Sequence, residues 1–301
     1  MKRFYRTTCI ILGLASFILT FVIWLQMPLV TGNLPPTGSF PLRIFLASIT
    51  ASITASLLWI GFSGELGAVR GGAIDLAVFY GGLTIFQILS AQHLLTGVLL
   101  CSAAAIVSLG IFLSFQRYPI EDSRPMPLPV RISFGVFVAV LLLVGSAILL
   151  QVPNVFAWTL NPASSSLVGW FFLGSSCYFL YGLIFPRWHT ACGQLWSFLA
   201  YDIVLIVPSF LHFTTVSPAK LPSLIINTFI LLYSCVLAIY YLLIKKDTRS
   251  RINIASLSSH VIQLLEWSKE FLAYVDHRLD KHSILMNDTE FKRGKSDARA
   301  H

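Results

Sequence analysis

Residues 131–152 read RISFGVFVAVLLLVGSAILLQV, and this stretch decides the class of fold. After Arg131 it contains no charged residue. A helix of this length covers about 33 Å at a rise of 1.5 Å per residue, and the hydrocarbon core of a bilayer is roughly 30 Å thick. The stretch therefore predicts a transmembrane helix.

Seven further segments share this apolar character. They lie at 8–27, 42–63, 73–91, 94–115, 167–185, 194–213 and 221–244. The whole chain is 56% hydrophobic and only 11% charged, whereas an ordinary soluble domain carries about 25% charged residues. The sequence therefore predicts an all-α fold, a polytopic membrane bundle of about eight transmembrane helices, and excludes an ordinary soluble domain.

The charges divide the chain into two parts. Residues 1–244 contain ten Lys or Arg and five Asp or Glu, whereas residues 245–301 contain eleven and eight. We therefore predict a transmembrane bundle over 1–244 and a cytoplasmic tail over 245–301. Apolar residues in the tail recur at spacings of three and four, which predicts an amphipathic helix at 253–285. We interpret this helix as a site for self-association or for a partner protein, with the membrane surface as the alternative.

The positions of the basic residues predict the orientation. Cytoplasmic loops of membrane proteins are enriched in Lys and Arg. With the N-terminus inside, only Arg43 and Lys220 fall on the exterior side, which favours eight crossings with both termini cytoplasmic in the inner (plasma) membrane of a bacterium. Segments 73–91 and 94–115 have a re-entrant hairpin as their alternative. The lipid bilayer is the predicted partner, and no nucleic-acid stripe is present.

Two pairs of short motifs suggest an internal duplication. PLRIF at 41–45 resembles PVRISF at 129–134, and HLLTG at 93–97 resembles HTACG at 189–193. If the second to fourth spans correspond to the fifth to seventh, two three-helix units have opposite senses. This arrangement would be an inverted repeat of the kind found in transporters. The alternative is that apolar segments resemble one another by composition alone.

Asp202 is the most informative single residue, because it lies well inside the span 194–213. A carboxylate at this depth is costly and by default marks a function, so it should be paired, protonated or facing a wet cavity. Pro208 removes a backbone hydrogen bond six residues later and favours a kink. We predict a substrate or ion path at Asp202, Tyr201 and Pro208. The alternative is a structural role, in which Asp202 forms an ion pair with Arg131 or packs against Tyr201.

Two other polar regions receive structural interpretations. Asp75 lies close to the start of the span 73–91, where we expect it to cap the helix or lie at the interface. In FPRWHTACGQLW at 185–196, Arg187 stands beside Trp188 and Trp196. This combination is typical of an interfacial anchor, and a site for an anionic ligand is the alternative.

Histidines and cysteines offer little evidence for a cofactor. His93 and His212 both fall near the outer side, and they are weak candidates for a metal or haem pair. No close ligand spacing accompanies them, and the five cysteines form no CxxC motif. We therefore predict no cofactor.

The span 42–63 contains ASITASITAS at 47–56. Its small residues recur every four positions, which places them on one helix face that another backbone can approach closely. These residues are Ala47, Ser48, Ala51, Ser52, Ala55 and Ser56. Such a face serves either packing within the chain or assembly of an oligomer.

These features favour a small transporter or permease with Asp202 on its path. The second hypothesis is a non-catalytic accessory or scaffold subunit that uses the small-residue face and the tail. An intramembrane enzyme or haem protein is the third, because no nucleophile and base can be placed together from the sequence.

Overall fold

The structure is a computed structural model that describes residues 2–25, 40–90, 95–118, 122 and 124–248. Within these ranges the regular structure is helical, apart from one isolated β-bridge between Pro125 and Arg187. The predicted amphipathic helix at 253–285 and the candidate ligand His93 lie outside the described residues.

Eight helices in the described part of the chain are long and apolar enough to cross a membrane. They are α1 (Lys2–Trp24), α3 (Phe40–Ser63), α4 (Val69–Leu89), α5 (Leu95–Ser114), α6 (Leu128–Leu149), α7 (Pro162–Ile184), α8 (Trp188–His212) and α9 (Leu221–Ile239). Short 3₁₀ turns at Leu66–Ala68, Phe115–Arg117 and Pro218–Lys220 adjoin α4, α5 and α9, and a π-helical turn at Tyr240–Ile244 continues α9. The all-helical prediction is confirmed. The segments 73–91 and 94–115 form two separate helices, α4 and α5.

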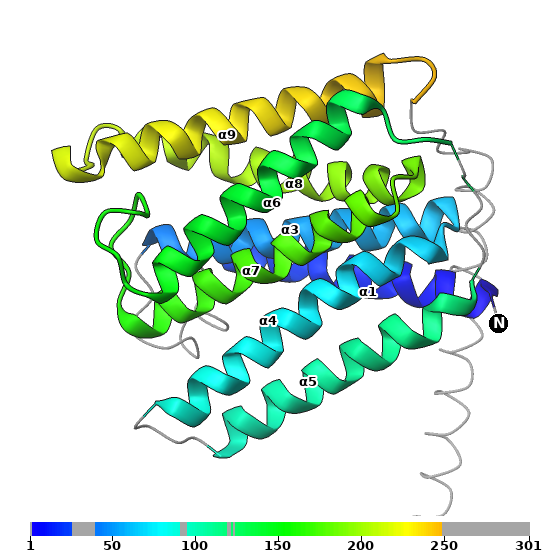
Figure 1. Ribbon diagram of the computed structural model, residues 1–301, viewed down its shortest axis with the longest axis horizontal. Coiled ribbons are helices and arrows are strands. Elements are labelled where there is room, and N and C mark those ends of the chain that lie inside the picture. The colour runs from blue at the N-terminus through cyan, green and yellow to red at the C-terminus, as the bar shows by residue number, and fades with distance from the viewer. Residues whose placement is uncertain (1, 26–39, 91–94, 119–121, 123, 249–301) are drawn as a thin grey trace, which may run out of the picture. The chain divides into compact units, whose positions relative to one another are not determined.

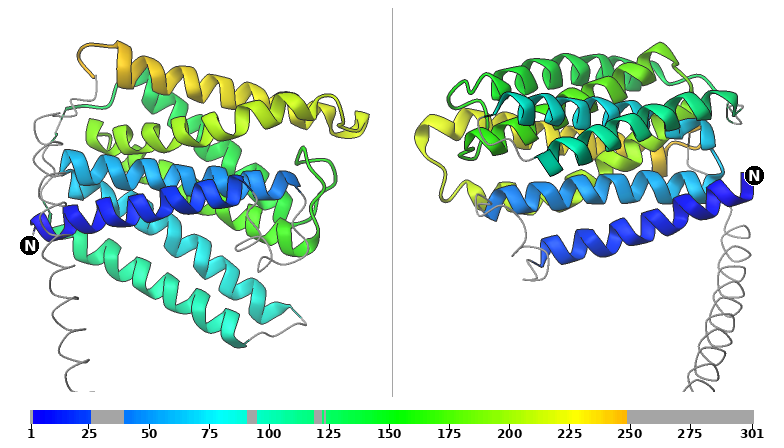
Figure 2. Two further views of the ribbon diagram at one scale, coloured as in Figure 1. Left: turned by 180° about the vertical axis from the view of Figure 1, so that it is seen from behind. Right: turned by 90° about the horizontal axis from the view of Figure 1, so that it is seen from below.

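The eight helices form two layers (Figures 1 and 2). One layer has the order α1, α3, α8, α9, and the other has the order α5, α4, α7, α6, with close packing between successive helices in each row. The chain begins in the first layer, makes all of the second, and returns to the first for α8 and α9 (Figure 1). As a result, α8 lies inside its layer, between α3 and α9.

The structure does not show the predicted inverted repeat. In the proposed first unit, α4 packs on α5 while α3 packs on α1 and α8. In the proposed second unit, α6 packs on α7, and α7 makes only slight contact with α8. The two units therefore pair their helices in different orders.

Helices α7 and α8 are among those that begin earlier than the sequence predicts. The segment NPASSS at 161–166, which precedes the predicted span 167–185, contains the start of α7: the side chain of Asn161 accepts a hydrogen bond from the backbone N–H of Ser164 at 2.8 Å, and Pro162 occupies the first turn. Both are established helix-start signals. Trp188 opens α8 and is only 1% exposed. It is a core residue, and its interpretation as an interfacial anchor was wrong.

Buried apolar side chains form two clusters along the bundle. One includes Trp59, Phe134 and Trp188, and the other includes Phe45 and Leu205. Many large apolar side chains elsewhere are exposed on the outer faces. Helix association in lipid depends on close van der Waals packing, so these two clusters hold the helices together while the exposed side chains suit a lipid environment.

The small-residue face of α3 is covered within the chain. Ala47, Ser48 and Ala51 are buried, and Ser56 contacts α7 and α8. The other two members, Ser52 and Ala55, are partly buried. Because α3 lies between α1 and α8, its small residues serve contacts within one chain.

Candidate functional site

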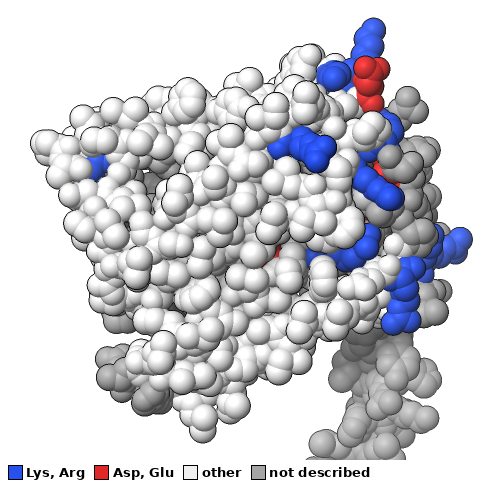
Figure 3. All heavy atoms as spheres, viewed as in Figure 1, with Lys and Arg blue, Asp and Glu red and all other residues white. Residues whose placement is uncertain are grey.

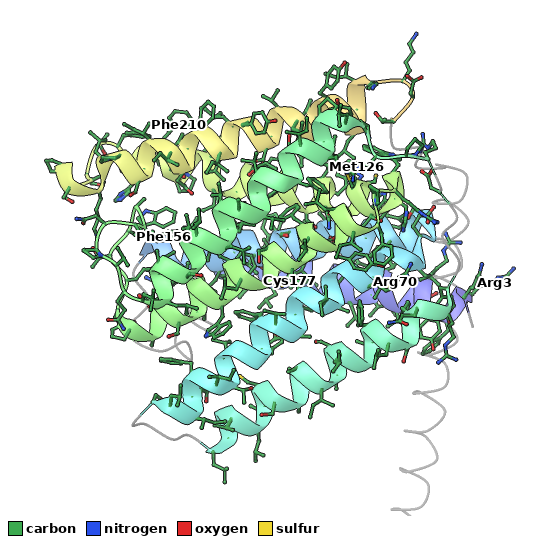
Figure 4. All side chains as sticks on the ribbon, viewed as in Figure 1. Arg3, Arg70, Met126, Phe156, Cys177 and Phe210 are labelled. Carbon is green, nitrogen blue, oxygen red and sulfur yellow. The ribbon has the colours of Figure 1, made fainter. Side chains whose placement is uncertain are left out.

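Lys and Arg side chains gather at one end of the bundle, the end at which α1 begins (Figure 3). Figure 4 shows Arg3 and Arg70 towards this basic end, and Phe156 and Phe210 towards the opposite end. Arg43 and Lys220, near the starts of α3 and α9, lie at the opposite end. The charge separation on which the predicted orientation depends is therefore a property of the fold.

Hydrogen bonds and an ion pair connect the loops at the basic end. The backbone N–H of Trp188 donates to the carbonyl of Arg124 at 2.7 Å. The Arg124 guanidinium binds the Asp122 carboxylate at 2.7 Å and also donates to the carbonyl of Asp247. Partial burial acts to raise the pKa of Asp122, but the hydrogen bonds from Arg124 outweigh it and hold this pKa below its usual range. These bonds join the loop before α6 to the start of α8 and to the residues after α9.

Helix α8 contains an unusual number of buried polar side chains. Those less than a tenth exposed are His189, Thr190, Gln194, Ser197, Asp202 and Ser209. Such residues inside a membrane bundle either bond to neighbouring helices or mark a path. They make α8 the candidate functional helix.

Three hydroxyl groups link the two layers in the first half of α8. Ser56 Oγ on α3 lies 3.5 Å from Tyr178 Oη on α7, and it also forms a hydrogen bond with Ser197 on α8. The Gln194 side-chain amide donates to the backbone carbonyl of Tyr178. The cluster therefore fixes α7 against α3 and α8, where the layers otherwise make few contacts.

Asp202 is 0% exposed and lies between α8 and α9. Its Oδ2 accepts a hydrogen bond from Ser234 Oγ at 2.7 Å, while its Oδ1 has no partner among the described residues. Ser234 Oγ also lies 2.8 Å from the carbonyl of Ile230 and 3.1 Å from that of Leu231. A hydroxyl has one proton to donate, so Ser234 has a choice of acceptors.

This choice lets the pair accommodate both protonation states of Asp202. When the carboxylate is ionised, the Ser234 hydroxyl donates to it. When Asp202 is protonated, its own O–H can donate to Ser234 Oγ, and the serine proton turns to the carbonyl of Ile230. A proton can therefore be gained or lost without leaving the pair unbonded, which avoids the cost of an unsatisfied polar group in a low-dielectric interior.

The predicted ion pair between Arg131 and Asp202 is not present among the described residues. Arg131 is exposed near the start of α6, at the basic end. Asp202 lies fourteen residues beyond Trp188, which is about 21 Å along α8, and it bonds to Ser234 instead. The two residues also belong to different layers, so depth and layer both separate them.

The two other residues of the predicted path, Tyr201 and Pro208, have different surroundings. The ring of Tyr201 packs edge-on to Phe45, with 6.2 Å between ring centroids. Pro208 lies inside α8, which stays helical to His212. Because proline has no N–H, the carbonyl of Val204 lacks its usual helical donor.

Asp75 lies deeper than the sequence predicts. It belongs to α4, and its carboxylate occupies the space that a Cβ at Gly174 would need. Gly174 is midway along α7, and the neighbouring Ser175 side chain bonds to the carboxylate. The predicted capping or interfacial role is therefore wrong, because the helix begins at Val69, six residues before Asp75.

The histidine hypothesis gains no support from the described residues. His212 Nδ1 lies 3.1 Å from Thr215 Oγ1, and its Nε2 lies 3.3 Å from the carbonyl of Ala157. Both ring nitrogens thus have hydrogen-bond partners within the chain. In the described ranges no group of three or more His, Cys, Asp or Glu side chains is placed to hold a metal ion.

The eight apolar helices are compatible with a multi-pass membrane protein. No protein-family model, curated protein or solved structure matches the chain.

Proposed function

We propose that this protein is a small multi-pass transporter whose path passes Asp202, and that this carboxylate binds and releases a proton or a small monovalent cation. The observation that carries the proposal is the arrangement of Asp202 and Ser234. The carboxylate is fully buried, has a hydroxyl partner suited to both protonation states, and keeps one oxygen without a partner among the described residues.

The charges inside the bundle favour a cationic ligand. Asp202 lies fourteen residues from the start of α8 and ten from its end, and Asp75 lies six residues after the start of α4, whereas the Lys and Arg residues of the described helices lie within about one turn of a helix end. A lone carboxylate at this depth is costly, and a cation or proton bound to it removes most of that cost. An anionic substrate would increase it.

The orientation belongs to the same proposal. The gathering of Lys and Arg at the basic end supports placing that end in the cytoplasm, with both termini inside and the protein in the inner (plasma) membrane of a bacterium. The tail then belongs to the cytoplasmic side, where the amphipathic helix predicted from its sequence would be available to a partner protein or a second copy of the chain.

The scaffold hypothesis loses one of its two supports. Its small-residue face, which includes Ala47 and Ser48, is covered by α1 and α8 of the same chain. The scaffold hypothesis now depends on the tail alone. It also gives no reason for a buried carboxylate at Asp202.

Transport by purified protein in sealed liposomes tests the proposal. The liposomes contain a trapped pH-sensitive dye, and a Na⁺ or K⁺ gradient is imposed across them. We expect wild-type protein to couple one of these gradients to proton movement, and Asp202→Asn to behave like empty liposomes. Asp122→Asn, at the surface, is the matched control and should retain activity.

Two further measurements keep the test decisive. Size-exclusion chromatography in detergent checks that Asp202→Asn is folded, and Ser234→Ala provides a variant that retains the carboxylate. Equal proton movement in wild type and Asp202→Asn, or no cation-coupled movement in the wild type, would overturn the proposed function.

A further inference from the structure

The interface of α8 and α9 contains a second polar level beyond Asp202. The helices run antiparallel (Figure 1), and the Asp202–Ser234 hydrogen bond fixes their register. Seven residues further along α8 is Ser209, and seven residues back along α9 is Asn227. These two residues therefore share a level about 10 Å nearer the opposite end.

Polar atoms at this level are buried without hydrogen-bond partners in the described structure. They are Ser209 Oγ, Asn227 Nδ2 and Thr228 Oγ1, and Ser209 is 0% exposed. Buried polar groups are nearly always satisfied, and where the protein supplies no partner, ordered water or an ion does so. Three such atoms from two helices at one level point to a hydrated site.

Apolar side chains separate this level from Asp202. Leu205 on α8 and Leu231 on α9 occupy the intervening level by the same register, and they are 1% and 2% exposed. Both belong to one buried apolar cluster. A tight apolar constriction blocks water and ions by dewetting, so this leucine pair has the position and chemistry of a gate.

On its other side, Asp202 has apolar neighbours over a longer distance. Between it and the basic end, the α8–α9 interface contains Leu195 and Leu199 opposite Leu237 and Tyr241, all in the other buried cluster. Trp188 and Tyr241 approach to 6.4 Å between ring centroids. Along this interface the nearest polar level to Asp202 therefore lies towards the opposite end.

We propose that Ser209, Asn227 and Thr228 form a hydrated vestibule for water and small cations, and that Leu205 and Leu231 are the gate between this vestibule and Asp202. This inference rests on the proposed function, because the proposed function supplies the cation that the vestibule would admit. The hydration of the vestibule is a physical property that can be measured without transport.

Cysteine labelling in the full-length protein tests the vestibule. The probe is a charged, membrane-impermeant methanethiosulfonate added to membrane vesicles of known orientation, and the labelled residue is located by peptide mass spectrometry with the native cysteines retained. The variant is Asn227→Cys, and the matched control is Ile226→Cys, because Ile226 is its neighbour on α9 and is 60% exposed on the outer face.

We expect Asn227→Cys to react at least about tenfold faster than Ile226→Cys, because the reagent attacks thiolate and a thiol ionises in water but not in lipid. Reaction should occur from the side opposite the basic end. Ser209→Cys is a second variant at the same level, in case Asn227→Cys does not fold. Equal rates at the vestibule and control positions would overturn the vestibule.

The gate is tested with Ser234→Cys, which places a thiol beside Asp202. We expect slow labelling in this variant, faster labelling when Leu231→Ala is added, and no increase with the control Leu237→Ala on the basic side. An equal response to both alanine substitutions would overturn the gate. If the vestibule is labelled but Asp202→Asn transports normally, the proposed function is wrong and the vestibule stands. If Asp202→Asn loses transport but the vestibule is not labelled, the vestibule is wrong and the proposed function stands.

Discussion

Asp202 and Asp75 both lie inside the helical bundle, one in each layer, and the structure surrounds them differently. Asp202 is fully buried between α8 and α9, with Ser234 as its partner and one oxygen unpartnered among the described residues. Asp75 is partly exposed on α4 and lies against the backbone of α7 at Gly174. Carboxylates inside one helical bundle therefore do not form one kind of site, because the groups that surround each carboxylate decide whether it can exchange a ligand.

The neighbours of each aspartate suggest its role. Gly174 gives Asp75 room by having no side chain, so the carboxylate serves as part of the contact between α4 and α7. Asp202 has a hydroxyl partner with alternative acceptors. Beyond a leucine pair lies a second level of polar atoms that have no hydrogen-bond partner among the described residues. These surroundings favour Asp202 for the proposed exchange of a proton or cation, and they favour a packing role for Asp75.

Neutralising each aspartate in turn should produce the largest difference. We expect Asp202→Asn to reduce cation-coupled proton movement to the level of empty liposomes, and Asp75→Asn to retain most of it. The measurement is the initial rate of dye response at equal amounts of inserted protein. Loss of activity in Asp75→Asn with retention in Asp202→Asn would reverse the assignment of the two residues.

Gly174→Ala should destabilise the fold through Asp75. Its new Cβ would overlap the Asp75 carboxylate and the adjacent α4 backbone, and overpacking of this kind costs typically about 1–3 kcal/mol. The matched control is Gly72→Ala, because a Cβ at Gly72 meets nothing within 4 Å and alanine favours helix by up to about 1 kcal/mol. In thermal unfolding in detergent, the unfolding temperature should fall in Gly174→Ala and rise in Gly72→Ala. A shift in the same direction for both variants would contradict the close approach of Asp75 to Gly174.

Ser234→Ala should have a smaller effect than loss of the carboxylate. It removes a hydrogen bond worth about 1 kcal/mol, so we expect about a fivefold change in transport rate and an altered pH profile. Ser175→Ala, which removes the hydroxyl partner of Asp75, should leave the pH profile unchanged. The measurement is the transport rate from pH 5 to pH 9, and identical profiles for wild type and Ser234→Ala would count against the proton-exchange role.

The number of helices was predictable because each long apolar segment carries its own evidence. Residues 131–152 predict α6 without reference to any other part of the chain. Asp202 was also recognisable, since a carboxylate in an apolar run is conspicuous by itself. Local capping signals at Asn161 and Pro162 were present in the sequence and would have placed the start of α7 correctly.

The neighbours of each helix were not predictable in the same way. Lipid-spanning helices use similar apolar and small side chains on every face, so the sequence does not distinguish the α3–α8 contact from other pairings. The expected ion pair between Arg131 and Asp202 was wrong for this reason, because predicting such a pair requires both the depth and the layer of each residue. Likewise, the Ser234 partner and the level of Ser209 and Asn227 depend on the register of α8 against α9.

A third aspartate, Asp122, extends the comparison to a site outside the helical spans. Its carboxylate bonds to Arg124 at 2.7 Å, and both side chains are partly exposed. Exposed ion pairs contribute about 0–1 kcal/mol. We therefore expect Asp122→Asn to lower stability by less than about 1 kcal/mol at pH 7, measured by thermal unfolding in detergent.

The pH dependence of this small effect follows from the lowered pKa of Asp122. A carboxyl group whose pKa is lower in the folded protein contributes its full stabilisation above the unfolded value, about 3.9, and loses it as the pH falls through the folded value. The difference between wild type and Asp122→Asn should therefore be constant from pH 8 to pH 5 and shrink below pH 4. A difference that grows on acidification would show that the Asp122–Arg124 bond is not the source of the stabilisation, because protonation removes the charge that Arg124 binds.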